Sequence, residues 1–316
     1  MENIIEQLLE STGKLTTRKK GVLAEKYVVS PFSILYTRDG SWQSRKKAWL
    51  SLGLRSELGR DKALTYPQIE NRTDFVGEAI KAKGGTSVFD PVLTECLYRW
   101  FTGTNYQVID PFAGGSVRGI IAGLMGRKYW GCDLSQKQIS ANKQQAESII
   151  IKRNEPKFHV PVWITGDSLT EMYTAPQADF ILTCPPYGQL EKYSDDPRDL
   201  SNMDYSTFID VYGKIISISI EKLKDNRFCA IVVGNFRNKL GFYEDFVGDT
   251  VRIFQKEGAK LYNDAILVNQ IGTGAIRASS HFDPGRKLVK MHQNVLVFCK
   301  GDWRQATQEL KTGGVL

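Results

Sequence analysis

The sequence contains few of the residues from which metal sites and disulfide frameworks are built. Its 316 residues include three histidines and five cysteines, and no two histidines have metal-ligand spacing. The cysteines are scattered, odd in number and form no C-x-x-C pair; they are Cys96, Cys132, Cys184, Cys229 and Cys299. This pattern is unlike that of a disulfide framework or a zinc site. We therefore expect no metal.

Long apolar runs are also missing. No uncharged apolar stretch reaches the ~18 residues that indicate a membrane-spanning helix. At the start of the chain, Glu2, Glu6 and Glu10 lie among isoleucines and leucines, which is typical of an amphipathic helix. A signal peptide would instead begin with basic residues followed by an apolar run. The sequence therefore predicts a cytoplasmic protein, in a bacterium or in a phage-infected host cell.

The remaining composition is ordinary except for an excess of positive charge. Hydrophobic residues make up 41% of the chain and charged residues 24%, as in a soluble globular protein with a full core. The net charge is +7. Such a charge favours a polyanionic partner, because lysines and arginines that neutralise phosphates release counterions.

Two basic regions are candidate nucleic-acid contacts. Residues 1–82 are interpreted as a basic N-terminal extension that contacts DNA, and residues 83–316 as the main domain; the second basic region spans 272–290. Trp42 and Trp49 lie among the charges of the first region, and mixtures of cations and aromatic rings suit phosphate contact and base stacking. A solvated charged face is the alternative for each region. The candidate contacts are Arg45, Lys46, Lys47, Arg277, Arg286 and Lys287.

From residue 88 onward, apolar strands alternate with helical segments. Strands are expected at 107–109, 129–132, 160–164, 179–183 and 228–233, with helices at 120–125, 136–151 and 205–223 between them. This alternation predicts an α/β fold with a mostly parallel sheet and helices on both faces. The last two expected strands, 265–270 and 294–299, have a polar connection between them. They predict an antiparallel hairpin at one edge.

A glycine-rich turn directly follows the first of these strands. Glycines let a backbone approach a ligand closely, and in an open parallel sheet this turn lies at the carboxyl edge, where ligands bind. The alternative is a tight turn without a ligand. The candidate cofactor-binding residues are Asp110, Pro111, Phe112, Ala113, Gly114 and Gly115.

Three further positions are candidates for the same site. Asp133 ends the second strand, and an acidic residue about 20 residues after a glycine turn can accept both ribose hydroxyls of an adenosine. It is followed by Leu134, and capping the helix that starts near Ser135 is a second, compatible role for Asp133. After the third strand, Asp167 and Ser168 line the site or form an ordinary loop cap.

The fourth strand is followed by a second motif, Thr183-Cys184-Pro185-Pro186-Tyr187. The D-P-F-A-G-G-S string at 110–116 and this motif resemble, in the same order, the cofactor loop D-P-F-x-G-(S/G)-G and the catalytic loop (D/N/S)-P-P-(Y/F/W) of S-adenosylmethionine-dependent amino-methyltransferases of DNA, the N6-adenine and N4-cytosine type. The resemblance covers residues 89–300, about two thirds of the chain. Segments 31–33 and 40–60 also look like the leader of phage-encoded methylases, which act in DNA methylation and restriction-modification.

The resemblance implies a class I, Rossmann-like methyltransferase fold with a mostly parallel seven-stranded sheet and a terminal antiparallel hairpin. It implies S-adenosylmethionine as cofactor and double-stranded DNA as partner, with transfer to N6 of adenine or N4 of cytosine. In the family, Asp167 lies near the cofactor adenine, and the helix that opens at Phe89 closes over its methionine end.

The resemblance also implies roles for Cys184, Pro185, Pro186 and Tyr187. An exocyclic amine is a poor nucleophile, because its lone pair is delocalised into the base. Two acceptors aimed at its N–H groups localise that pair: the first side chain of the motif and a main-chain carbonyl set by the prolines, which fix the backbone. The base must leave the duplex, and stacking on Tyr187 contributes roughly 1–3 kcal/mol. Tyr193, in the loop 188–202, is a second stacking candidate.

Cys184 departs from the family pattern, because a thiol is a weak acceptor. It acts as a serine substitute, or as a thiolate beside the cofactor's positive charge, or the site is inactive. Two other functions therefore stay open. One is an RNA methyltransferase acting on a guanine exocyclic amine, since such enzymes often carry P-P-Y-G. The other is a noncatalytic protein that binds S-adenosylmethionine or DNA.

Overall fold

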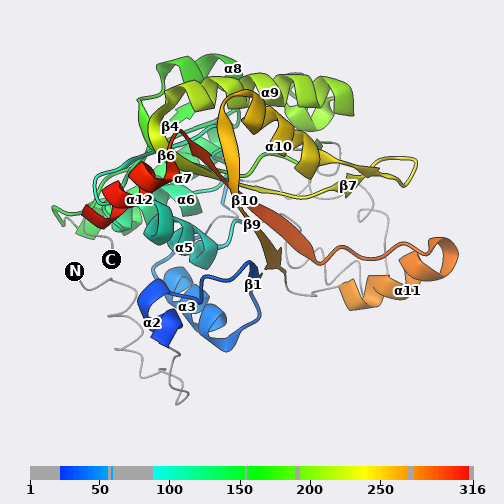
Figure 1. Ribbon diagram of the computed structural model, residues 1–316, viewed down its shortest axis with the longest axis horizontal. Coiled ribbons are helices and arrows are strands. Elements are labelled where there is room, and N and C mark those ends of the chain that lie inside the picture. Colours follow the sequence, from blue (N-terminus) through cyan, green and yellow to red (C-terminus); the bar gives the residue numbers. More distant parts are fainter. Residues whose placement is uncertain are drawn as a thin grey trace.

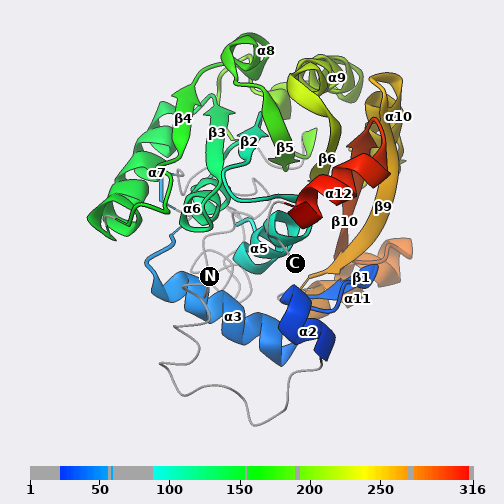
Figure 2. The same cartoon turned by 60° about the vertical axis from the view of Figure 1, so that its left-hand side comes forward.

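The computed structural model describes residues 22–55, 58–59, 88–153, 155–188, 193–269 and 274–312. Its centre is an eight-stranded sheet in the order β1-β9-β10-β6-β5-β2-β3-β4, which can be followed in Figures 1 and 2. The strands are β1 (Ile34–Tyr36), β2 (Gln107–Asp110), β3 (Lys128–Asp133), β4 (Val162–Thr165), β5 (Ala178–Thr183), β6 (Leu223–Val233), β9 (Ala259–Val268) and β10 (His292–Lys300).

The sheet is parallel from β4 through β6, and β10 is antiparallel to both of its neighbours, β6 and β9. This order, with a late antiparallel strand inserted between β6 and β9, is the class I, Rossmann-like methyltransferase fold, so the predicted fold class is confirmed. The predicted antiparallel pairing of the last two strands is present as β9 with β10. The sheet has eight strands and not the predicted seven, because β1 pairs in parallel with β9 at that edge.

Helices cover both faces of the sheet. One buried cluster lies under α5 (Pro91–Phe101), α6 (Val117–Leu124), α7 (Gln136–Ile149) and α12 (Trp303–Thr312). A second cluster on the other face lies under α8 (Ser168–Glu171), α9 (Tyr205–Lys222) and α10 (Phe246–Lys256). The predicted helix 205–223 coincides with α9. Within the described residues, no helix combines the length and the apolar character needed to cross a membrane.

The N-terminal segment packs onto this domain through α2 (Val22–Tyr27) and α3 (Gly40–Ser51). Trp42 and Trp49 of α3 are buried, as is Arg45, which forms two hydrogen bonds to Glu95 of α5, at 2.6 and 2.5 Å. The prediction that Arg45 contacts nucleic acid is therefore wrong, because its guanidinium is buried in an ion pair with Glu95 inside the protein. The two tryptophans likewise pack in the core.

Several predicted features lie outside the described residues. They are the amphipathic helix near the start of the chain, the boundary at residue 82/83 and most of residues 56–87. The connection between β9 and β10 contains α11 (Gly274–Gly285), a helix that the sequence did not predict. A short hairpin, β7 (Phe236–Arg237) with β8 (Tyr243–Glu244), follows β6. The hairpin and α11 project from the same side of the molecule (Figure 1).

Candidate active site

Both sequence motifs line one cavity of about 900 Å³ beyond the carboxyl ends of β2, β3, β5 and β6. Most of the predicted site residues lie on its wall: Phe89, Pro111, Phe112, Gly114, Gly115, Asp133, Leu134, Asp167, Ser168, Cys184, Pro185, Pro186 and Tyr187. Asp110 and Ala113 are fully buried behind the glycine turn and do not line the cavity. The prediction that Asp110 and Ala113 contact the cofactor directly is therefore wrong.

Asp110 instead joins the two motifs. Its Oδ1 accepts hydrogen bonds from the Thr183 hydroxyl at 2.7 Å and from the Phe112 amide at 3.2 Å. Its Oδ2 accepts from Arg118 Nε at 2.6 Å and from the Tyr129 hydroxyl at 2.8 Å. A buried carboxylate needs such partners to offset its desolvation. Asp110 therefore fixes the cofactor-type loop and the Pro-Pro-Tyr loop relative to each other.

Arg118 is a site residue that the sequence analysis missed. It lies on the cavity wall, donates to the carbonyls of Phe112 at 2.6 Å and Ala113 at 3.0 Å, and lies 4.5 Å from the centre of the Phe89 ring. Burial disfavours its charge, but the Asp110 carboxylate outweighs burial and raises the pKa of Arg118 above its usual range. The guanidinium therefore stays charged and holds the glycine turn. Its position as the second residue of α6, directly after the glycine turn, was the available signal.

Asp133 connects the glycine turn to the start of α7. Its Oδ2 accepts from the Gly114 amide and its Oδ1 from the Ser135 amide, both at 2.9 Å. Gly114 has a φ of +49°, a backbone conformation that favours glycine. The cap of α7 is Ser135, whose hydroxyl accepts from Gln138 N at 3.2 Å. The helix-cap alternative for Asp133 is thus wrong, since the cap lies two residues later.

Asp167 lines the cavity and caps a helix, whereas Ser168 lines the cavity only. Asp167 caps α8 by accepting from the Leu169 amide at 2.9 Å, and it also lines the cavity. Ser168 donates to the Pro111 carbonyl at 2.5 Å. This bond ties the loop after β4 to the loop after β2. The two carboxylates, Asp133 and Asp167, therefore lie on a wall that several short hydrogen bonds hold in place.

The start of α5 also lines the cavity. Asp90 caps α5 by accepting from the Val92 and Leu93 amides, and it also accepts from Trp42 Nε1 at 3.1 Å and Lys46 Nζ at 2.9 Å. Lys46 thus lies on the cavity wall in an ion pair. Its contact with nucleic acid stays a prediction. Lys47, the next residue, is exposed.

The Pro-Pro-Tyr loop forms the opposite end. Cys184 and Tyr187 are half-buried and Pro185 is buried. The Tyr187 hydroxyl accepts a hydrogen bond from the Gln293 side chain, and its ring packs edge-on against Phe246 at 6.3 Å. Burial raises the pKa of Tyr187 well above its usual range. The phenol is therefore neutral at physiological pH and its ring is held in one orientation.

Residues from the ends of β6 and β10 complete this end of the cavity, and the sequence analysis did not identify them. They include Asn235, Lys290, His292 and Gln293. Lys290 donates to the Asn235 carbonyl at 3.1 Å, and burial lowers the pKa of its ammonium group. Gly234, directly after β6, adjoins this group: a Cβ there would lie 3.4 Å from Lys290 Nζ and 3.7 Å from the Tyr187 ring, which are ordinary contact distances.

The predicted nucleic-acid contacts of the second basic region lie only partly within the described residues. Arg286 is exposed and Lys287 is half-buried, whereas the Arg277 side chain lies outside the described residues. Tyr193 lines the cavity with 38% of its surface exposed. Residues 189–192, between Tyr193 and the motif, also lie outside the described part.

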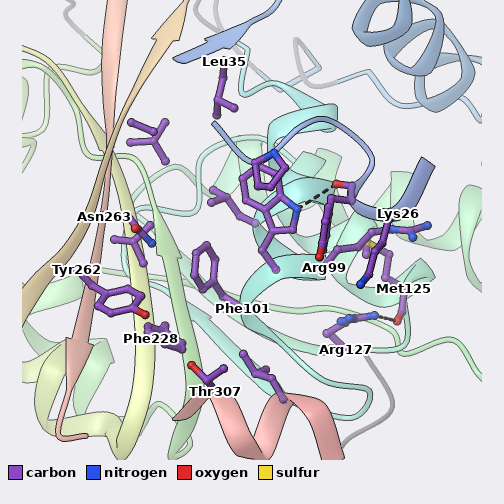
Figure 3. A pocket seen from close by; sticks show the side chains of 18 of the residues that line it. Lys26, Leu35, Arg99, Phe101, Met125, Arg127, Phe228, Tyr262, Asn263 and Thr307 are labelled. Atoms are coloured by element: carbon purple, nitrogen blue, oxygen red, sulfur yellow. Dashed lines mark hydrogen bonds between the residues drawn. The ribbon is translucent and has the colours of Figure 1, made fainter. Parts of the chain in front are cut away.

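A second cavity of about 800 Å³ lies on another part of the molecule, between the N-terminal segment, α5, β9 and α12 (Figure 3). Phe101, Phe228 and Tyr262 form part of its wall, with Lys26 and Arg127 beside them. Its lining contains no residue of the two motifs. The first cavity, in which the motifs meet, is therefore the candidate active site.

Comparison with known proteins yields structural likeness only. No family model and no curated protein matches the sequence. TrmN from Thermus thermophilus is 16% identical over 67% of this chain and 49% of its own length, with a TM-score of 0.44, so the chain spans about half of that protein. Magnesium protoporphyrin IX methyltransferase (ChlM) from Synechocystis PCC 6803 with bound S-adenosylmethionine is 12% identical over 73% of this chain and 86% of its own, with a TM-score of 0.43.

A candidate DNA modification methylase, also from Thermus thermophilus, is 18% identical over 43% of this chain and 52% of its own, with a TM-score of 0.33. These values are too low to carry an argument about substrate. The fold rests on the strand order described above.

Proposed function

We propose that this protein is an S-adenosylmethionine-dependent methyltransferase that acts on the exocyclic amine of adenine (N6) or cytosine (N4) in DNA. The observation that carries the proposal is the meeting of the two motifs in one cavity. Asp110 hydrogen-bonds to Phe112 in the first motif and to Thr183 at the start of the second. The two motifs therefore form a single site.

The residues at one end of the cavity fit S-adenosylmethionine. Gly114 and Gly115 carry no side chain that would obstruct a ligand, and Asp133 lies beside them with carboxylate oxygens that can each accept more than one hydrogen bond. Phe89 and Leu134 offer apolar surface. When bound, the cofactor supplies an electrophilic methyl group. The protein's task is to hold a base amine facing it.

The other end of the cavity fits a flipped base. Tyr187 presents a neutral ring of fixed orientation on which a base can stack, which is a sequence-tolerant interaction. The Pro185 carbonyl and Cys184 are the acceptors for the amine N–H groups. The ring of Pro185 fixes its φ, and Pro186 restricts the ψ that sets the direction of the Pro185 carbonyl. With both N–H groups engaged, the amine lone pair is directed away from the ring.

Incubation of the full chain with methyl-labelled S-adenosylmethionine tests this proposal. Mixed-sequence duplex DNA and structured RNA are the two substrates, followed by digestion to nucleosides and chromatography. We expect label in N6-methyladenine or N4-methylcytosine. Label in a guanine amine of the RNA would favour the alternative enzyme, which Pro185-Pro186-Tyr187-Gly188 also matches. Cofactor binding by calorimetry with no label in either substrate would indicate a noncatalytic protein.

A further inference from the structure

The β7–β8 hairpin exposes two large apolar side chains at its turn. Leu240 is 82% exposed and Phe242 is 71% exposed, which places them among the most exposed large hydrophobic residues described. Turns favour Gly, Pro, Asn, Asp and Ser. Nothing in the turn itself therefore requires Leu or Phe at these positions. Both side chains are therefore available to a partner outside the chain.

The turn is held rigid by its own hydrogen bonds. Asn238 Oδ1 accepts from the Leu240 amide at 3.0 Å and from the Phe242 amide at 3.1 Å, and the Gly241 amide donates to the Asn238 carbonyl at 2.9 Å. Arg237 donates to the Gly241 carbonyl at 2.7 Å. A rigid turn loses little conformational entropy when it contacts a partner.

The hairpin is continuous with the Tyr187 end of the active site. Phe236, at its base, lines the cavity, and Gly188 packs against the Phe236 ring. Lys290, beside Tyr187 and Gly234, lies 5.8 Å from the centre of the Tyr243 ring. A partner bound at the turn would therefore adjoin the place where a flipped base is expected.

Cations lie beside the turn that carries the two apolar side chains. Arg237 lies 4.1 Å from the centre of the Tyr243 ring, and Lys287, from the segment after α11, packs against Gly241. Within 234–244 and 283–293, the charged residues are Arg237, Lys239, Arg286, Lys287 and Lys290 against Glu244 and Asp283. Glu244 is engaged by the Asn238 amide at 2.9 Å. This excess of positive charge favours a phosphate backbone.

We propose that the β7–β8 turn enters duplex DNA beside the target base, with Leu240 and Phe242 as the wedge and the surrounding cations on the phosphates. Proteins that insert apolar side chains between base steps unstack those steps and kink the duplex. The wedge would hold open the gap that a base leaves when it moves into the Tyr187 pocket. This inference rests on the proposed function.

The test compares methyl transfer to a long mixed-sequence DNA as duplex and as heat-denatured single strands. The variant is Leu240→Ser with Phe242→Ser, and both residues are exposed enough for the fold to be retained. We expect its duplex rate to fall about tenfold or more while its single-strand rate and cofactor affinity stay unchanged, because single strands need no wedge. Tyr173→Ser, at an exposed aromatic shortly before β5, is the matched control.

Equal duplex-to-single-strand ratios in the variant and the parent would overturn the wedge and leave the proposed function intact. If the parent methylates neither DNA form, the proposed function fails. Insertion of the wedge is then tested separately, by relaxing a closed plasmid with topoisomerase in the presence of the protein and measuring the linking number. A change in linking number that the double variant loses supports it. The same linking number with parent and variant overturns the wedge. Binding of the turn to another protein, with no effect on DNA, would overturn it as well.

Discussion

At the scale of single residues, Asp133 has two functions that an experiment can separate. Its carboxylate accepts from two backbone amides that shape the glycine turn, and in the proposed function it also accepts from the cofactor ribose. Hydrogen bonds to charged groups contribute roughly 1.5–3 kcal/mol. We therefore expect Asp133→Ala to weaken S-adenosylmethionine binding by about one to two decades, measured by calorimetry.

Asp133→Asn is the control for that prediction. It keeps one acceptor oxygen for the turn but removes the charge, so its affinity should lie between those of the parent and the alanine variant. Unchanged affinity in a folded Asp133→Ala protein would remove Asp133 from the ribose site.

Cys184 occupies the acceptor position directly before Pro185, and we expect it to work as a serine substitute in direct methyl transfer. Cys184→Ser should keep or raise the rate, because a hydroxyl accepts better than a thiol. Cys184→Ala should lose part of the rate, and Tyr187→Ala more, since the base loses its stacking partner. The measurement is the single-turnover rate at saturating cofactor. Complete loss with serine would show that the sulfur itself is required, and a thiolate or covalent step would replace this model.

At the scale of elements, the contact between α3 and α5 depends on one buried carboxylate. Glu95 accepts hydrogen bonds from Arg45 and from Trp49 Nε1, and Arg99 Nε lies 3.2 Å from Glu95 Oε1. Removing one partner of a buried ion pair typically costs about 3–5 kcal/mol. Glu95→Gln should lower the free energy of unfolding by an amount of that order in denaturant titrations. Glu155→Gln, in the exposed pair with Lys157, should cost at most about 1 kcal/mol.

The same contact predicts a dependence of stability on pH. Burial disfavours the charge of Glu95, but Arg45 outweighs burial and the pKa of Glu95 lies below its ordinary value of 4.5. A carboxyl whose pKa is depressed in the folded state stabilises fully above the unfolded pKa and loses that contribution as the pH falls through the folded pKa. The acid limb of the stability curve below pH 4.5 should therefore flatten in Glu95→Gln. An acid limb identical to that of the parent would contradict this assignment.

At the scale of the whole molecule, the two basic regions differ in how many of their charges remain available to DNA. Arg45 and Lys46 are engaged by Glu95 and Asp90, which leaves Lys47 as the exposed member of that set. In the second region, Lys287 packs against Gly241 of the projecting hairpin, and the exposed Arg286 precedes it in the chain. Each true phosphate contact contributes about one to the log–log slope of affinity against salt. The double variant Arg286→Gln and Lys287→Gln should reduce the slope for duplex DNA by about two.

Fluorescence titrations over a range of salt concentrations measure this slope. Lys157→Gln, on the rim of the second cavity, is the control with one charge removed elsewhere. A slope that the double variant leaves unchanged would exclude the segment after α11 from the DNA footprint. A slope reduced by Lys47→Gln as well would restore part of the first basic region to it.

The sequence by itself determined the alternation of strands and helices from residue 107 onward and the two loops that carry the chemistry. These features are local: apolar periodicity and a run of glycines or prolines define them without reference to distant residues. Thirteen cavity-lining residues between Phe89 and Tyr187 were identified from such local signals, but Arg118, which lines the cavity between them, was not. The antiparallel placement of β10 was predictable in part, because β9 and β10 follow each other along the chain in the sheet.

Only the tertiary structure decided which charges face inward and what joins the motifs. Arg45 resembles any surface arginine until Glu95, fifty residues later, is packed against it, and burial then requires the pair to be satisfied internally. Asp110 likewise acquires its role from Thr183, which lies 73 residues later in the chain. Arg118 packs on Phe89, which lies well before it. The strand β1 depends on the free edge of β9, and such long-range pairing leaves little trace in three residues of sequence.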